Sequence, residues 1–178
     1  MQRRQESTVL RGWGNFGKAM PVALVGAAGA ALAFGDERMH NIGLISLESV
    51  AGAIGVSAAG KYAVGRARPG EERGPWSQVG NGSRSQASFP SGHSAVAFAA
   101  VTPFAQEYDA PWLYGVAALS SAGRVAARQH WVSDTVAGSL VGYVIGSWLW
   151  HAQRDNRSAS VSITPGPKDV SVAWRGSY

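Results

Sequence analysis

Residues 19–35 read AMPVALVGAAGAALAFG, which is seventeen consecutive positions without a charged side chain. Four further runs hold one charge between them: 39–60, 95–106, 110–123 and 135–153. A membrane-spanning helix needs about 20 mostly apolar residues, although about 17 suffice. Two of the five runs are long enough alone, two become so with flanking residues, and run 110–123 is marginal. The pattern predicts an all-α bundle of five to six helices that crosses a membrane.

The residues of these runs suit helices that pack closely in lipid. The chain holds 23 Gly, and 15% of its residues are charged, against about 25% in ordinary soluble domains. Small side chains allow transmembrane helices to approach closely. Four Trp near the ends of the runs suit a lipid–water interface: Trp112, Trp131, Trp148 and Trp150. A mean hydropathy of −0.05 favours the alternative, a soluble all-α domain of short buried helices.

Charge and cysteine content exclude several classes of protein. The chain has 16 basic and 11 acidic groups, a net charge of +5, and 13 of its basic groups are Arg. Arg binds phosphate and carboxylate through two parallel hydrogen bonds. Because the Arg residues form no basic stripe and cluster between Lys61 and Arg128, we expect a small anionic partner and no nucleic acid. The absence of Cys excludes disulfides, a Cys-ligated zinc and a thiol nucleophile.

The chain divides into three parts. Residues 1–18 are polar and basic, 19–153 contain the predicted bundle, and 154–178 form a tail. Apolar residues of the tail alternate on both sides of a Pro-Gly-Pro turn, which weakly favours a short β-hairpin over an irregular tail. Within the bundle, Pro69–Pro90 is rich in Gly, Ser and Pro and predicts a long loop, and such loops are often functional.

Three short segments hold nearly all the side chains that could catalyse a reaction or bind an anion. The first, KYAVGRARP at 61–69, follows an apolar run. As a helix that ends at Pro69, it would place Lys61, Gly65 and Arg68 near one face. The alternative is a helix whose basic last turn only opposes its dipole.

The second segment, SFPSGHS at 88–94, precedes another apolar run. Ser91 is a good N-cap, and Gly92 allows close approach of the backbone. The free N–H groups of a helix N-terminus bind anions, and His93 would stand beside such an anion. The alternative for His93 is a side chain directed to solvent.

The third segment is GRVAARQHWVSDT at 123–135. His130 and Asp134 are four residues apart, so one helical turn would place the carboxylate beside the imidazole. A carboxylate there fixes the tautomer and raises the basicity of the other ring nitrogen. The alternative for Asp134 is a cap on the last helix.

Together, the three segments predict a phosphate site. Phosphoryl transfer needs cations for the equatorial oxygens, an in-line nucleophile and an acid for the leaving group. Lys61, Arg68 and Arg124 would supply the cations, and the two His the other roles. The sequence has no carboxylate cluster for magnesium, and two His lack a third ligand for zinc. We therefore expect no metal and no other cofactor.

These segments resemble the signature of the type 2 phosphatidic acid phosphatase family, which is shared with bacterial class A acid phosphatases and vanadium haloperoxidases. The family motif Lys-x6-Arg-Pro is present as Lys61–Pro69, and Pro-Ser-Gly-His as Pro90–His93. The motif Ser-Arg-x5-His-x3-Asp is present from Arg124 to Asp134. The resemblance covers residues 19–150 and leaves the tail unexplained.

One position departs from the family pattern. Gly123 stands where the third motif has Ser, which removes one hydroxyl that could contact phosphate. Ser120 and Ser121 are the candidates to compensate for it.

The resemblance implies a role for each site residue. His130 would attack phosphorus and form a phosphohistidine, with Asp134 orienting and polarising it. His93 would protonate the leaving alkoxide and then activate water. Five residues would bind the phosphate: Lys61, Arg68, Arg124, Ser91 and Gly92.

The resemblance also implies an integral-membrane lipid phosphatase of the bacterial inner membrane, with its site on the periplasmic side. Substrates would be of the phosphatidic acid, phosphatidylglycerophosphate or isoprenyl diphosphate class. Membrane members commonly have six helices, so the sixth would be an interfacial helix in residues 1–18 or a segment upstream. The alternatives are a soluble periplasmic acid phosphatase, a lipid phosphotransferase and a vanadate-dependent haloperoxidase. The sequence predicts no oligomeric state.

Overall fold

The computed structural model describes residues 8–69, 76, 87–158, 160–165 and 170–175. It has five helices: α1 (Thr8–Phe34), α2 (Glu37–Val64), α3 (Gly92–Glu107), α4 (Trp112–Ala126) and α5 (Val132–Ser158). Two antiparallel strands follow, β1 (Ser160–Pro165) and β2 (Val170–Arg175), with Ser160 paired to Arg175. The described bundle is therefore all-α, and most of the loop expected at Pro69–Pro90 lies outside the described residues.

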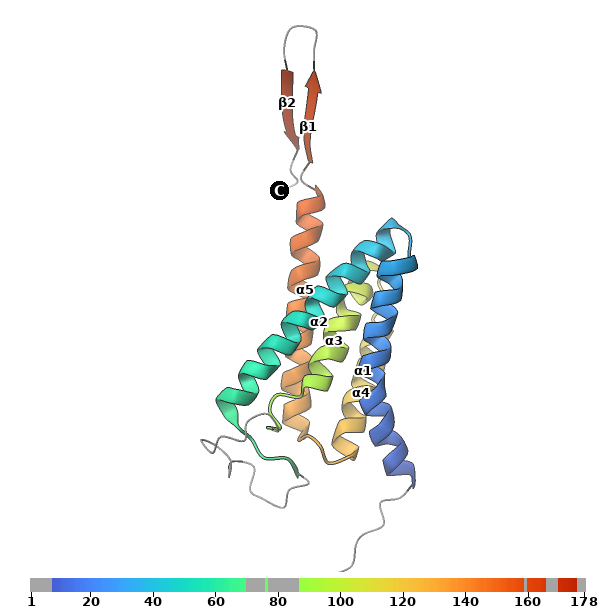
Figure 1. The fold of residues 1–178 in the computed structure, drawn as a ribbon, viewed down its shortest axis with the longest axis vertical. Helices are drawn as coiled ribbons and strands as arrows, with labels where there is room; N and C mark the ends of the chain where they lie inside the picture. Colours follow the sequence, from blue (N-terminus) through green and yellow to red (C-terminus); the bar gives the residue numbers. More distant parts are fainter. Residues whose placement is uncertain (1–7, 70–75, 77–86, 159, 166–169, 176–178) are drawn as a thin grey trace, which may run out of the picture.

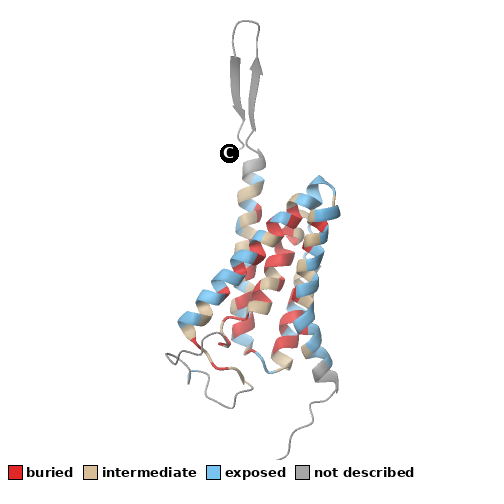
Figure 2. Cartoon of the chain, in the orientation of Figure 1, coloured by how far each residue is buried: buried red, intermediate tan, exposed pale blue. Residues whose placement is uncertain are grey.

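Helix α3 is the centre of the bundle. It packs against each of the other four helices, which surround it in the order α1, α2, α5, α4 (Figure 1). Burial follows this arrangement, since buried residues line the inward faces and α1 and α2 expose their outer faces (Figure 2). The residues that begin α3 are thus enclosed by the ends of the neighbouring helices.

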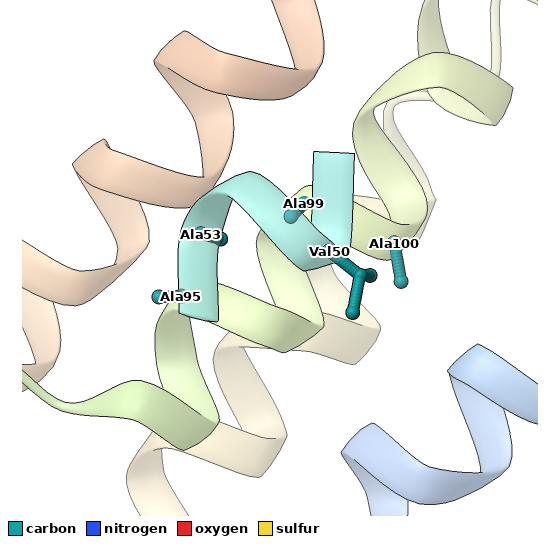
Figure 3. Close-up of a cluster of buried hydrophobic side chains, with 5 residues drawn as sticks. All are labelled: Val50, Ala53, Ala95, Ala99 and Ala100. Atoms are coloured by element: carbon teal, nitrogen blue, oxygen red, sulfur yellow. The ribbon is translucent and has the colours of Figure 1, made fainter. Parts of the chain in front are cut away.

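Small side chains make this close packing possible. A buried cluster joins α2 to α3 through Val50, Ala53, Ala95, Ala99 and Ala100 (Figure 3). On α5, three buried glycines at intervals of four residues face α3: Gly138, Gly142 and Gly146. A Cβ at Gly142 would lie 2.2 Å from the carbonyl oxygen of Ala95, so the two backbones are in direct contact there.

The helix boundaries differ from the expected ones in two places. Helix α1 begins at Thr8 and runs without interruption through residue 18, so residues 8–18 are not a separate interfacial helix. Helix α2 ends at Val64 and not at Pro69, because Gly65 adopts a left-handed conformation (φ 60°) and its N–H caps the carbonyl of Lys61. Arg68 therefore lies beyond the end of α2 and not on the helical face of Lys61.

Two helices are long and apolar enough to cross a membrane by length and composition. They are residues 12–34 of α1 and the whole of α2. The other three helices of the described chain do not meet that criterion.

Candidate functional site

The three chemically rich segments meet at one end of the bundle. The C-terminal ends of α2 and α4 and the N-terminal ends of α3 and α5 lie together in the lower part of Figure 1. The backbone N–H of Ser91 donates to the carbonyl of Asp134 at 2.9 Å, which ties the start of α3 to that of α5. The fold thus brings residues 61–69, 87–94 and 123–135 into one site.

His130 is held by a backbone carbonyl. Its ring is 2% exposed, and Nδ1 lies 2.8 Å from the oxygen of Ser88. A carbonyl oxygen only accepts, so Nδ1 carries the proton and Nε2 of the neutral ring has a free lone pair. The expected contact with Asp134 is longer: Nδ1 and Oδ2 are 3.8 Å apart, an ion-pair distance and not a hydrogen bond.

Asp134 is fully buried, and both oxygens of its carboxylate accept hydrogen bonds. Its Oδ2 accepts from the Ser88 hydroxyl and, at 2.8 Å, from the N–H of Trp131, while Oδ1 accepts from Arg66 at 2.7 Å. The bond to Trp131 joins the N-cap of α5 to its third residue, so Asp134 also has the capping role that was the alternative. Burial alone would raise the pKa of Asp134, but its contacts with His130, Ser88, Trp131 and Arg66 together lower it.

Three cations lie near the two predicted His side chains: Lys61 and Arg68 act on both His130 and His93, and Arg124 acts on His93. Lys61 Nζ donates to the carbonyl of Ala87 at 2.6 Å, and NH1 of Arg68 lies 3.0 Å from Oε1 of Gln129. Arg124 is 8% exposed, and its buried Nε has no partner among the described residues. Burial lowers the pKa of His130, assisted by Arg68 and Lys61 and opposed by Asp134 and the Ser88 carbonyl.

His93 lies within electrostatic range of His130 and of the three cations. Burial, and then the charges of Arg124, His130, Arg68 and Lys61, lower its pKa to about 4. His93 is therefore neutral at pH 7 when no anion is bound. It is half-buried and not directed wholly into solvent. In the described part of the chain, no group of three His, Asp or Glu side chains is arranged to hold a metal ion.

Ser91 and Gly92 form the predicted start of a helix. Ser91 is the N-cap of α3, and its Oγ accepts from the N–H of Ser94 at 3.4 Å. The Ser94 hydroxyl donates to Ser91 Oγ at 3.1 Å and accepts from the Ser121 hydroxyl at 2.9 Å. Ser121 is thus linked to Ser91 through the Ser94 hydroxyl.

An apolar groove leads away from the site. It has a volume of about 520 Å³ and runs between α1 and α2, with α3 as its floor. Its walls are mainly aliphatic, and at one end it includes Lys61, Gly92 and His93. A larger hollow of about 830 Å³ lies toward the other end of the bundle and touches none of the predicted site residues.

Comparison with known proteins agrees with this geometry. The model of the PAP2 superfamily matches residues 42–158, a range that includes all three segments. The chain belongs to the PAP2 superfamily. The resemblance to the type 2 phosphatidic acid phosphatases is thereby confirmed.

One curated relative of this PAP2 chain is the lipid A 1-phosphatase of Porphyromonas gingivalis. The two are 38% identical over 98 residues, which is 52% of this chain and 19% of the relative. This chain therefore aligns with about a fifth of that protein. No solved structure matches.

The departure from the PAP2 pattern at Gly123 has a structural cause. A Cβ there would lie 2.5 Å from the carbonyl oxygen of Trp13 and 2.9 Å from Cα of Gly17, because α4 meets α1 at this point. A Ser at 123 has no room. Ser120 does not replace the missing hydroxyl in the site, since it donates to the carbonyl of Gly17 at 3.2 Å.

Two residues that contact His130 or Asp134 were not predicted from the sequence. Ser88 contacts both His130 and Asp134, and Arg66 contacts Asp134. Both stand inside the quoted segments, but neither belongs to the motifs of the PAP2 superfamily that we matched. The available signal for Arg66 was the second Arg in the first segment, two positions before Arg68.

Proposed function

We propose that this chain is an integral-membrane lipid phosphatase that hydrolyses a phosphomonoester or diphosphate through a phosphohistidine. The observation that carries the proposal is the continuity of the apolar groove with the cationic site, since Lys61 and His93 line both. A lipid phosphate has the same order of parts, with a charged head next to a hydrocarbon chain. The name of the bacterial relative, a lipid A phosphatase, supports the same class of substrate.

The outer surface of α5 supports a lipid environment. Large apolar side chains recur every four residues along it, each more than half exposed: Val132, Val136, Leu140, Val144 and Trp148. Glycines occupy the buried side of the same helix. A helix in a soluble domain buries its large apolar side chains instead. Transmembrane bundles place small residues at helix contacts and large apolar ones toward lipid, as α5 does.

The first step of the proposed reaction uses the free lone pair of His130. Nε2 attacks phosphorus while Lys61, Arg68 and Arg124 bind its oxygens, and the bond to the leaving oxygen breaks. The leaving alkoxide takes a proton from His93. Burial lowers the pKa of His93 most, and the neighbouring cations lower it further; an incoming phosphate dianion neutralises these cations and so favours the protonated imidazole.

The second step regenerates the enzyme. His93, now neutral, removes a proton from water, and the hydroxide attacks the phosphohistidine. The bond between Nε2 and phosphorus breaks, and inorganic phosphate leaves. Three cations perform the charge neutralisation that a metal ion supplies elsewhere, so we propose that the reaction is independent of metal.

An activity assay tests this proposal. The purified chain in detergent should release phosphate from at least one lipid of a panel of phosphatidic acid, phosphatidylglycerophosphate, isoprenyl diphosphate and lipid A 1-phosphate, with EDTA present. Loss of activity in EDTA contradicts the metal-free reaction. Activity on water-soluble esters alone favours the acid phosphatase, and transfer of phosphate to a second lipid favours the phosphotransferase.

The groove itself is tested by filling it. Ala58 lines the groove one turn before Lys61, so Ala58→Phe should raise KM for a long-chain phosphate far more than for glycerol phosphate. Ala59 is exposed on the same helix and does not line the groove, which makes Ala59→Phe the matched control. Equal KM changes in the two variants would show that the groove does not bind the chain.

We further propose that the chain lies in the bacterial inner membrane with the site end on the periplasmic side. The absence of Cys allows single cysteines to report orientation. Arg128 is exposed at the end of the bundle that holds the site, and Glu37 is exposed at the opposite end, so the variants are Arg128→Cys and Glu37→Cys. An impermeant maleimide should label the first and not the second in cells with a permeabilised outer membrane, and the opposite pattern contradicts the orientation.

A further inference from the structure

Arg66 contacts the carboxylate of the site. Its NH1 lies 2.7 Å from Oδ1 of Asp134 and 2.7 Å from Oγ of Ser133. The Arg66 side chain is 13% exposed and that of Asp134 is fully buried. Solvent and salt screen such a pair little, so the guanidinium acts on the carboxylate at close to full strength.

Aromatic rings and backbone contacts fix Arg66 in place. Its guanidinium carbon lies 5.3 Å from the ring centre of Trp131 and 5.1 Å from that of Trp76. The indole N–H of Trp131 donates to the carbonyl of Ala67 at 3.0 Å, and the N–H of Ser88 donates to the carbonyl of Arg66 at 2.7 Å. The guanidinium is thus positioned without any help from a substrate.

The two oxygens of Asp134 have different partners. Oδ1 faces Arg66, whereas Oδ2 accepts from Ser88 and Trp131 and is the atom nearest to His130. We propose that Arg66 is a positioning residue that neutralises the buried Asp134 carboxylate and holds its Oδ2 toward His130. This inference rests on the proposed function, because it takes His130 as the nucleophile.

The proposal predicts a specific change in pH dependence. Without Arg66, an ionised Asp134 would raise the pKa of His130, and protonated His130 cannot attack. If Asp134 instead became protonated, its own pKa would have risen. Both effects move the acidic limb of the kcat profile to higher pH. The other charged or titratable groups that act on His130 stay the same: Lys61 on α2, Arg68, and His93 on α3, with Arg124 on α4 acting on His93.

The test compares three variants on a lipid monophosphate in detergent. Arg66→Gln should lower kcat about tenfold or more, shift the acidic limb upward by about one pH unit and leave KM nearly unchanged. Arg66→Lys should restore the limb, since it keeps the charge. Arg38→Gln is the matched control, because Arg38 forms a 2.7 Å ion pair with Glu107 outside the site and should leave the profile unchanged.

Three outcomes would overturn the proposal. If the pH profile of kcat for Arg66→Gln superposes on that of the wild type, Arg66 does not act through Asp134. If KM rises strongly while the acidic limb of the profile stays in place, Arg66 is a phosphate ligand. If Arg66→Gln does not fold, Arg66→Lys decides: it should bind inorganic phosphate with the wild-type Kd, and a weakened Kd contradicts the proposal. A wild-type chain that lacks activity refutes the proposed function instead.

Discussion

Gly142 lies where α5 crosses α3, and the structure leaves no space there for a methyl group. A Cβ at this position would lie 2.2 Å from the carbonyl oxygen of Ala95, 2.7 Å from the nitrogen of Ala99 and 3.0 Å from Cβ of Phe98. Ordinary contacts begin at 3.4 Å. Two of the three atoms belong to the backbone, so no side-chain rotation relieves the overlap. Gly142→Ala must therefore separate the two helices by about 1 Å.

The cost of this separation follows from packing. Overfilling a packed interior destabilises by about 1–3 kcal/mol. Gly55→Ala is the control, because Gly55 is an exposed position of α2 with nothing within 4 Å of an added Cβ. There the same substitution should stabilise by up to about 1 kcal/mol through helix propensity. Helix propensity favours Ala over Gly at both positions and cancels in the comparison, so we expect the free energies of unfolding of the two variants to differ by about 1–3 kcal/mol.

Denaturant unfolding of both variants in the same micelles measures this difference. Activity should fall as well in Gly142→Ala, because Asp134 is two turns away on α5 and its carbonyl accepts from Ser91 at the start of α3. A Gly142→Ala variant as stable and active as Gly55→Ala would refute the reasoning that the glycines of α5 set the geometry of the site.

Three further predictions concern the helix contact at Gly123 and the titration of the site. Gly123→Ser should lower thermal stability in detergent and not raise activity, because its side chain meets the backbone of α1; a more active variant contradicts this. When inorganic phosphate binds at pH 7, the wild type should take up to about one proton more than His93→Gln, because His93 becomes protonated. Calorimetry in two buffers measures this proton uptake, and equal uptake by the two proteins would show that His93 is not the group that is protonated. Stability should fall as the pH drops below about 6.5, because the lowered pKa values of His93 and His130 mean that the unfolded chain binds more protons there. Asp134, whose pKa is also lowered, adds a second loss below about pH 4; thermal unfolding that is independent of pH from 7 to 3 contradicts both.

The all-α bundle could be predicted because it depends on local patterns, and the candidate site residues were proposed from local spacing. Runs without charge define the helices, and residue spacing within three segments identifies Lys61, His93 and His130. The contacts between segments could not be predicted in this way. Ser88 reaches His130 across 42 positions, and Arg66 reaches Asp134 across 68.

Local conformation also limited the prediction. A helix to Pro69 was consistent with the residue pattern, but Gly65 turns the chain out of the helix and leaves Arg68 beyond its end. The departure at Gly123 is visible in the sequence, but its cause lies in α1, more than 100 positions away. Close approach of two backbones leaves little mark on a sequence rich in Gly.

Trapping of the covalent intermediate tests the central claim most directly. The wild-type chain is mixed with a lipid monophosphate that is labelled on phosphorus, and the reaction is quenched rapidly in alkali. The protein should then carry a label that is stable in alkali and lost in acid, as expected of a phosphohistidine. His130→Gln should carry none. His151→Gln should keep the label, because His151 is exposed on the far part of α5. Label retained by His130→Gln, or absent from an active wild-type chain, would contradict the account.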